Sequence, residues 1–136
     1  MLHMMDTDTA SYFIRDRPPA IKKKVLEIPS SDLCVSAVTS AELLYGLKRL
    51  PSDHRLQIGV KEFLLTIRVL AWDAEVAGHY ADLRHQLVST GQPIGELDMM
   101  IAAHSISTAA TLVTNNTRHY QRINGVVLAN WALPES

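Results

Sequence analysis

Two carboxylates stand close to the start of the sequence, where the apolar run at residues 2–5 ends in Asp6-Thr7-Asp8-Thr9. A carboxylate that ends a buried strand must be hydrogen-bonded, paired with a cation or bound to a metal ion. An aspartyl phosphatase would use such an aspartate as its nucleophile, whereas a metal-dependent nuclease would use it as a ligand. A third interpretation is purely structural, with Asp8 as the cap of the first helix.

The phosphatase interpretation rests on two resemblances and fails on a missing residue type. An apolar strand followed by D-x-D-x-T resembles the first motif of the haloacid-dehalogenase-like phosphatases, and residues 111–115 resemble their second motif. That chemistry also needs a later lysine, which neutralises the phosphate. After Asn115 the sequence contains no Lys and no Asp. A receiver-like phosphoacceptor domain needs a lysine after its last strand, so the same observation argues against it.

Three further carboxylates fall in patterns that allow either a metal site or helix capping. Glu42 stands among apolar residues, but the stretch T-S-A-E at residues 39–42 also has the pattern of a capping box. Glu96 and Asp98 fall in the first turns of a predicted helix, where acidic side chains suit the positive end of the helix dipole. Taken singly, each of them leaves both interpretations open. Carboxylates that converge at one edge repel one another, and a hard divalent cation is the usual way to hold them together.

The elements that would position these side chains alternate between short apolar strands and segments with helical periodicity. Strands are expected at residues 2–5, 33–36, 69–72, 111–114 and 126–128, and helices are expected to begin near Pro18-Pro19, Thr39, Ser52, Asp73 and Gly95. This alternation predicts an α/β fold, a three-layer α/β/α sandwich with a central, mainly parallel five-stranded sheet. In such sheets the loops at the carboxyl ends of the strands form the site, which places Asp6, Asp8 and Thr114 at one edge.

The composition indicates an ordinary globular chain. The 136 residues are expected to form a single domain over residues 1–136, and 47% of them are hydrophobic. A formal net charge of −1 does not by itself indicate nucleic-acid binding. Cys34, the only cysteine, lies in an apolar run and is expected to be a buried thiol. No segment approaches the roughly 18 apolar residues of a membrane span, and Asp6 and Asp8 interrupt any signal sequence, so we expect a cytoplasmic protein.

Four pieces of the sequence occur in an order that is shared with a known family. They are Asp6-Thr7, V-T-x-x-E-L-x-x-G at residues 38–46, G-x-P-I-G-x-x-D-x-x-I-A-A-H at residues 91–104, and V-T-N-N-T-R-x-x-x-R-I-x-G at residues 113–125, with Trp131 beyond. Together they resemble the PIN-domain ribonucleases, and specifically the VapC toxins of bacterial toxin–antitoxin pairs. The resemblance spans essentially the whole chain and extends to the enteric-type VapC proteins, which cut initiator tRNA in the anticodon region.

The resemblance implies a site, a reaction and partners. Asp6, Glu42 and Asp98 would hold Mg²⁺ or Mn²⁺, Thr114 and Asn116 would support the site through neutral oxygens, and the reaction would be hydrolysis of RNA, with tRNA as the substrate. The further acids are Asp8 and Glu96, and the candidate RNA-binding cations are Arg15, Lys22, Lys23, Lys24, Arg118 and Arg122. The implied partners are a second copy of the chain and a VapB-type antitoxin that covers the acidic pocket. DNA would be contacted only through that antitoxin, and no membrane is involved.

Two positions depart from the family pattern. Asp8 replaces the usual Asn or Ser, and Asn116 stands where many members have Asp. These changes motivate the alternative of a catalytically impaired PIN-like module that acts through antitoxin binding and operon regulation. We expect Asp8 to cap the first helix by accepting from the backbone amide of Ala10 or Ser11. His104 falls on the apolar side of its helix and is expected to be a hydrogen-bonded core residue.

Overall fold

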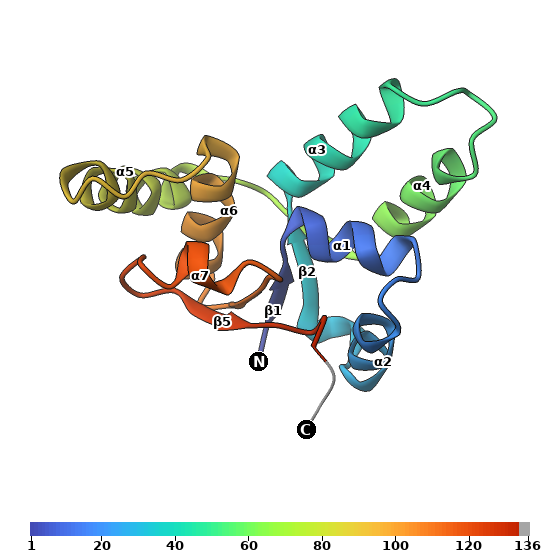
Figure 1. Ribbon diagram of the computed structural model, residues 1–136, viewed down its shortest axis with the longest axis horizontal. Coiled ribbons are helices and arrows are strands. Elements are labelled where there is room, and N and C mark those ends of the chain that lie inside the picture. Colours follow the sequence, from blue (N-terminus) through green and yellow to red (C-terminus); the bar gives the residue numbers. More distant parts are fainter. Residues whose placement is uncertain (134–136) are drawn as a thin grey trace.

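The computed structural model of the protein describes residues 1–133. Helices and strands alternate along most of the chain (Figure 1). The strands are β1 (His3–Met5), β2 (Leu33–Ser36), β3 (Arg68–Leu70), β4 (Thr111–Val113) and β5 (Val127–Ala129). The helices are α1 (Thr7–Ile14), α2 (Pro19–Glu27), α3 (Ala37–Lys48), α4 (Leu56–Thr66), α5 (Ala74–Ser89), α6 (Glu96–Ser107) and α7 (Thr117–Tyr120), and a 3-10 turn, η1 (Ser30–Asp32), precedes β2.

All five strands belong to one parallel sheet in the order β3-β2-β1-β4-β5. The central strand is β1, in which His3 is in register with Leu33 of β2 on one side and with Thr111 of β4 on the other. The predicted three-layer α/β/α sandwich with a parallel five-stranded sheet is confirmed. Because parallel strands share their carboxyl ends, the loops after β1, β2 and β4 open at the same edge.

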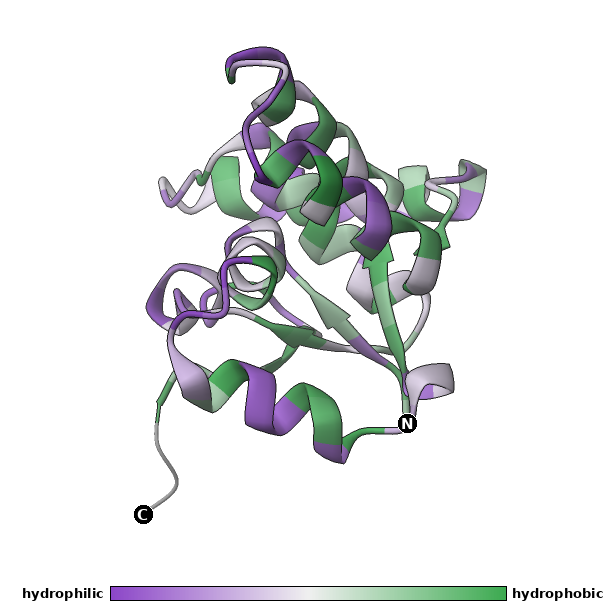
Figure 2. Cartoon of the chain, turned by 90° about the vertical axis from the view of Figure 1, so that its right-hand side faces the viewer, coloured by the Kyte–Doolittle hydropathy of each residue, from purple (hydrophilic) through white to green (hydrophobic). Residues whose placement is uncertain are grey.

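Alternation along the strands produces one apolar core on each face of the sheet. Met4 and Leu112 face a core shared with α5 and α6, whereas Met5 and Val113 face a core shared with α1, α2 and α4. Figure 1 shows these two groups of helices on opposite sides of the sheet. In Figure 2 the strands are coloured mainly as hydrophobic and the helices carry both colours, as expected for helices that each cover one face.

Cys34 lies inside the first of these cores, as the sequence predicted. Its side chain is fully buried, and burial raises the pKa of the thiol to about 12. A thiol of this kind remains protonated and unreactive at neutral pH. Among the described residues, no helix is long and apolar enough to cross a membrane.

Two helices begin at residues other than those predicted, and each difference has a local cause. The helix expected from Ser52 begins only at Leu56, because His54 Nδ1 accepts from the Leu56 N–H at 3.1 Å in the preceding turn. The helix expected from residue 39 begins at residue 37, because the Ser36 hydroxyl accepts from the Val38 N–H at 3.1 Å and caps α3. The second difference bears directly on the site.

Candidate functional site

Asp6 lies at the carboxyl end of the central strand and begins helix α1. Its backbone N–H donates to the Val113 carbonyl at 2.9 Å, and its Oδ1 accepts from the Thr9 N–H at 2.8 Å. Only 5% of the residue is exposed. Burial raises the pKa of the Asp6 carboxyl, and hydrogen bonds from Thr114 and Thr9 offset part of that rise. Strand pairing and the helix cap together hold this carboxylate at the edge of the sheet.

The prediction that Asp8 caps the first helix is wrong. Helix α1 begins at Thr7, so Asp6 is the N-cap and Asp8 lies in the first turn. The reason is that β1 ends at Met5, which leaves Asp6 to adopt the extended cap conformation. Asp8 is exposed and lines a groove beside Glu42. In that position its charge suits the start of the helix dipole and remains available to a ligand.

Glu42 does not close a capping box, which corrects the structural interpretation of residues 39–42. Because Ser36 caps α3, Glu42 lies more than one turn inside that helix. Its Oε1 instead accepts a hydrogen bond from the Thr7 hydroxyl of α1. Burial raises the pKa of the Glu42 carboxyl, and the carboxylates of Asp98 and Asp8 raise it further. Glu42 is therefore held over the start of α1, within reach of the other acids.

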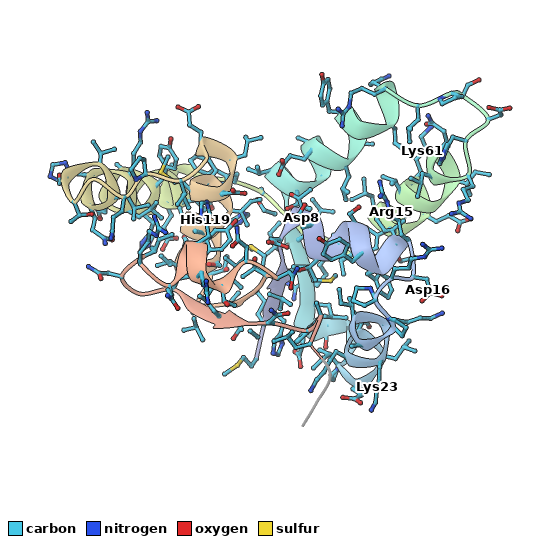
Figure 3. The ribbon with its side chains drawn as sticks, viewed as in Figure 1. Asp8, Arg15, Asp16, Lys23, Lys61 and His119 are labelled. Carbon is cyan, nitrogen blue, oxygen red and sulfur yellow. The ribbon has the colours of Figure 1, made fainter. Side chains whose placement is uncertain are left out.

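Asp98 is in the first turn of α6 and approaches from the opposite face of the sheet. Its side chain is 45% exposed, and the buried Tyr120 hydroxyl donates a hydrogen bond to it. The pKa of Tyr120 is raised by burial and by the carboxylates of Asp98, Asp6 and Asp8. His119 Nε2 lies 3.9 Å from Asp98 Oδ2. Figure 3 shows His119 on α7 and Asp8 on α1 at the same end of the sheet.

The four carboxylates share one small region with few counter-charges. They come from the junction of β1 with α1 (Asp6 and Asp8), from α3 (Glu42) and from α6 (Asp98). Within residues 1–133 no Lys or Arg forms an ion pair with any of the four, and His119 is their one ion-pair partner. The raised pKa of Glu42 is the electrostatic consequence of placing it, partly buried, beside Asp98 and Asp8.

Thr114 joins this group from the end of β4, whereas the Asn116 side chain does not. Thr114 is fully buried, its hydroxyl hydrogen-bonds to Asp6, and its Oγ1 accepts from the Asn116 N–H at 3.0 Å. Asn116 is exposed and precedes α7 without a side-chain capping bond. The structure therefore brings together Asp6, Glu42, Asp98 and Thr114, with a backbone amide from Asn116.

Glu96 is turned away from the group. It forms an ion pair with Arg84 of α5 at 3.3 Å, and its side chain is 70% exposed. An exposed pair of this kind contributes little to stability, but it directs the Glu96 carboxylate toward α5. The structure thus separates Glu96 from Asp98, although both stand in the first turn of α6.

The candidate RNA-binding cations lie in three different places. Lys22, Lys23 and Lys24 are on α2, and Figure 3 shows Lys23 far from Asp8. Arg118 is exposed on α7, and Arg122 follows that helix. Arg15 ends α1 and lines the same groove as Asp8.

His104 is a hydrogen-bonded core residue, as predicted, and it connects α6, which carries Asp98, with α3, which carries Glu42. It is 1% exposed, and its Nδ1 lies 2.7 Å from the hydroxyl of Ser36, which caps α3. Burial lowers the pKa of His104, and Asp73 and the Ala71 carbonyl offset part of this. A neutral imidazole therefore links α6, which bears Asp98, to the start of α3.

The donor atoms at this site fit a hard divalent cation. Carboxylate oxygens are the ligands that Mg²⁺ and Mn²⁺ prefer. Burial is the main cause of the raised pKa of Glu42, and a cation would relieve the repulsion from Asp98 and Asp8 that adds to it. In the described part of the chain, no three His, Cys, Asp or Glu side chains form a ready metal centre. Three of the four carboxylates accept from donors of the protein itself, Asp6 from Thr9, Glu42 from Thr7 and Asp98 from Tyr120.

Sequence reasoning did not assign the side chains that orient these acids. Thr7 stands next to Asp6, but its contact with Glu42 depends on how α1 packs against α3. Tyr120 and His119 follow β4 in a segment without helical periodicity, and no sequence pattern records the contact of Tyr120 with Asp98. Their ring centroids are 5.8 Å apart, in an edge-to-face arrangement.

The chain matches a known family and solved structures over nearly its whole length. The family model described as PIN domain matches residues 4–125. The tRNA(fMet)-specific endonuclease VapC of Shigella flexneri is 33% identical, over 95% of this chain and 97% of that protein. DNA-bound VapBC from Salmonella typhimurium aligns with a TM-score of 0.89 and 34% identity, over 96% of this chain and 99% of that one. VapBC2 from Rickettsia felis, bound to a promoter DNA fragment, aligns with a TM-score of 0.88 and 32% identity, over the same shares.

Proposed function

The chain belongs to the PIN-domain family and, within it, to the VapC toxins, and from this premise we propose that it is the toxin of a VapBC-type toxin–antitoxin pair. It acts as a metal-dependent endoribonuclease on tRNA, and its substrate is initiator tRNA, cut in the anticodon region. The observation that carries the proposal is the convergence of Asp6, Asp8, Glu42 and Asp98 without a Lys or Arg partner among the described residues. One domain over residues 1–136 performs this function.

The carboxylates are proposed to bind the metal ion. PIN-domain nucleases generally depend on a divalent metal, and we assign Mg²⁺ here, with Mn²⁺ as a substitute. Asp6, Glu42 and Asp98 would hold the ion, and Asp8 would add an oxygen at the solvent side. When bound, the ion would activate water, orient the scissile phosphate and neutralise charge on the leaving oxygen.

Neighbouring hydroxyl groups are proposed to orient these ligands. Thr114 hydrogen-bonds to Asp6, and Thr7 donates to Glu42. Tyr120 donates to Asp98 from a buried position. Partners of this kind fix the direction of a ligand oxygen, and their loss commonly costs about 10–100-fold in metal affinity or activity. Glu96, paired with Arg84, takes no part.

The partners follow from the charge of the site and from the solved relatives. A VapB-type antitoxin would place a cation, such as an arginine, among the four carboxylates and so compete with the metal ion. The solved relatives include VapBC complexes on DNA, and we propose that this chain reaches DNA only through its antitoxin and works as a homodimer. Its tRNA substrate lies in the cytoplasm, which is where it acts.

The test uses purified protein, initiator tRNA and an elongator tRNA as the matched control. With Mg²⁺ we expect discrete initiator tRNA fragments with 5′-phosphate and 3′-hydroxyl ends, and none in EDTA or with Asp98→Asn. Fragments that persist in EDTA or in the variant would refute the metal-nuclease mechanism. If the protein left the tRNA uncut but still bound its antitoxin, the result would favour the catalytically impaired module instead. In that case restoring the family pattern with Asp8→Asn and Asn116→Asp is expected to restore cleavage.

A further inference from the structure

A groove runs along helix α1 from the gathered carboxylates to the end of that helix. It begins at Asp8 and Glu42, lies between α1, α3 and α4, and has a volume of about 430 Å³. A second hollow of about 740 Å³ continues it past the end of α1, since Arg15 and Leu56 line both. Figure 3 shows Asp8 near the start of α1, Arg15 near its end and Lys61 on the neighbouring helix α4.

The two ends of this groove carry opposite charge. Asp8 and Glu42 stand at one end, and the other end is lined by arginines, namely Arg15, Arg17, Arg49 and Arg55. In the part of the chain that the structure describes, none of these arginines forms an ion pair with a carboxylate. Asp16 also lines the second hollow, but it is paired with Lys22 at 3.6 Å. The guanidinium groups are therefore available to anionic groups of a ligand.

The floor of the groove is apolar. Leu43, Leu47, Leu56 and Val60 line the first hollow, and Tyr12 adds an aromatic ring to the second. Proteins that hold single-stranded nucleic acid combine a positively charged groove for the phosphates with aromatic side chains on which bases stack, and here Tyr12 offers such a ring. Both features occur here along one line that starts at the carboxylates.

The spacing of the two charged ends suits a strand that passes through both. Arg15 lies two helical turns beyond Asp8, which is about 10 Å along the axis at ~1.5 Å per residue. An RNA strand with its scissile phosphate at the carboxylates would therefore reach the arginines with phosphates a few nucleotides away. An arginine fork matches phosphate oxygens two at a time, whereas lysine binds as a point charge.

We propose that this groove is the track for the single-stranded RNA on one side of the cut, with Arg15, Arg49 and Arg55 as its phosphate contacts. The inference rests on the proposed function, because it takes the carboxylate end as the place of cleavage. It also narrows the candidate RNA-binding cations that the sequence suggested, because it keeps Arg15 and leaves out the lysines of α2. Lys23 and its neighbours on α2 lie outside the track (Figure 3).

The test measures RNA affinity against salt concentration in the non-cleaving Asp98→Asn protein, with EDTA present. The probe is a fluorescent anticodon stem-loop of initiator tRNA, and the variants are Arg15→Gln, Arg49→Gln and Arg55→Gln. Each phosphate contact with a single strand contributes about 0.7 to the slope of log affinity against log salt. Each variant should lower the slope by about 0.7, which is roughly 2.6-fold in affinity over a fourfold change in salt. Arg84→Gln on α5 makes the same change of charge outside the groove and should leave the slope unaltered.

Groove variants with the same slope as Arg84→Gln would overturn the proposal. So would variants that weaken binding of a VapB-type antitoxin without changing the RNA slope, because the groove would then be a protein-docking surface. Circular dichroism and thermal melting identify any of the three arginine variants that fails to fold. The salt dependence is then measured on the variants that do fold. The proposed function has a separate readout, which is cleavage of tRNA by the protein with Asp98 intact. If the arginine variants lower the salt slope but the protein with Asp98 intact cuts no RNA, the RNA track is supported and the proposed ribonuclease activity is refuted.

Discussion

Replacing Asp6 by asparagine and by alanine separates two roles of this side chain. Asp6 caps α1 through its 2.8 Å hydrogen bond from the Thr9 N–H, and it is also a proposed metal ligand. Asparagine keeps an acceptor for the cap but removes the charge, whereas alanine removes both. Since burial raises the pKa of the Asp6 carboxyl, the fold disfavours its charged form, and asparagine relieves that cost.

The expected magnitudes follow from the cap. Loss of an N-cap side chain costs about 0.5–2 kcal/mol, and in a domain of this size 1 kcal/mol corresponds to roughly 3–5 °C in melting temperature. Asp6→Ala should therefore melt about 2–10 °C below the wild type in EDTA. Asp6→Asn should melt at or above the wild-type temperature. Both should lose cleavage of tRNA in Mg²⁺.

The assay pairs thermal melts in EDTA with tRNA cleavage in Mg²⁺ on the same preparations. If the asparagine variant melted as low as the alanine variant, the charge of Asp6 rather than its capping oxygen would stabilise the start of α1. If the asparagine variant still cut tRNA, Asp6 would not belong to the proposed site. Either result would refute the reasoning.

Three further predictions concern the surroundings of the site. Tyr120→Phe removes the donor to Asp98 and should weaken Mg²⁺ binding about 10–100-fold by calorimetry, and an unchanged affinity would contradict the orienting role. Because burial lowers the pKa of His104 from 6.5, the unfolded chain takes up the proton first, so stability should fall as pH drops below about 6.5. The free energy of unfolding, measured by urea denaturation, should fall less between pH 7 and pH 5 in His104→Gln than in the wild type. Mg²⁺ at about 100 times its dissociation constant should raise the free energy of unfolding by ~2.7 kcal/mol. Asp98→Asn should abolish this gain, and an equal gain in both proteins would place the ion elsewhere.

How far the sequence predicts the site depends on where each helix begins. Short apolar strands were enough to place Asp6 and Thr114 at one edge of a parallel sheet. They could not decide whether Asp6 or Asp8 caps α1, because each precedes a threonine and periodicity does not resolve a helix start within two residues. The end of β1 at Met5, where its pairing with β4 ends, decides it.

Overlapping local patterns account for the other error. Residues 39–42 have the spacing of a capping box, but Ser36 is an equally good cap and lies where β2 ends. The choice depends on the pairing of β2 with its neighbours, which no local pattern records. The contacts of Thr7 with Glu42 and of Tyr120 with Asp98 likewise join segments far apart in the sequence. A single sequence carries no signal for contacts of that kind.

The strand order also has a consequence for synthesis on the ribosome. The strand made first, β1, lies in the centre of the sheet and pairs with β4, at residues 111–113, which is made late. Thr114 and Tyr120, which hold Asp6 and Asp98, follow β4 directly. The proposed site therefore cannot assemble on a growing chain until the segment after β4 has left the exit tunnel. If the chain acts on tRNA as proposed, we expect the nascent protein to leave intact the tRNAs that decode its own message.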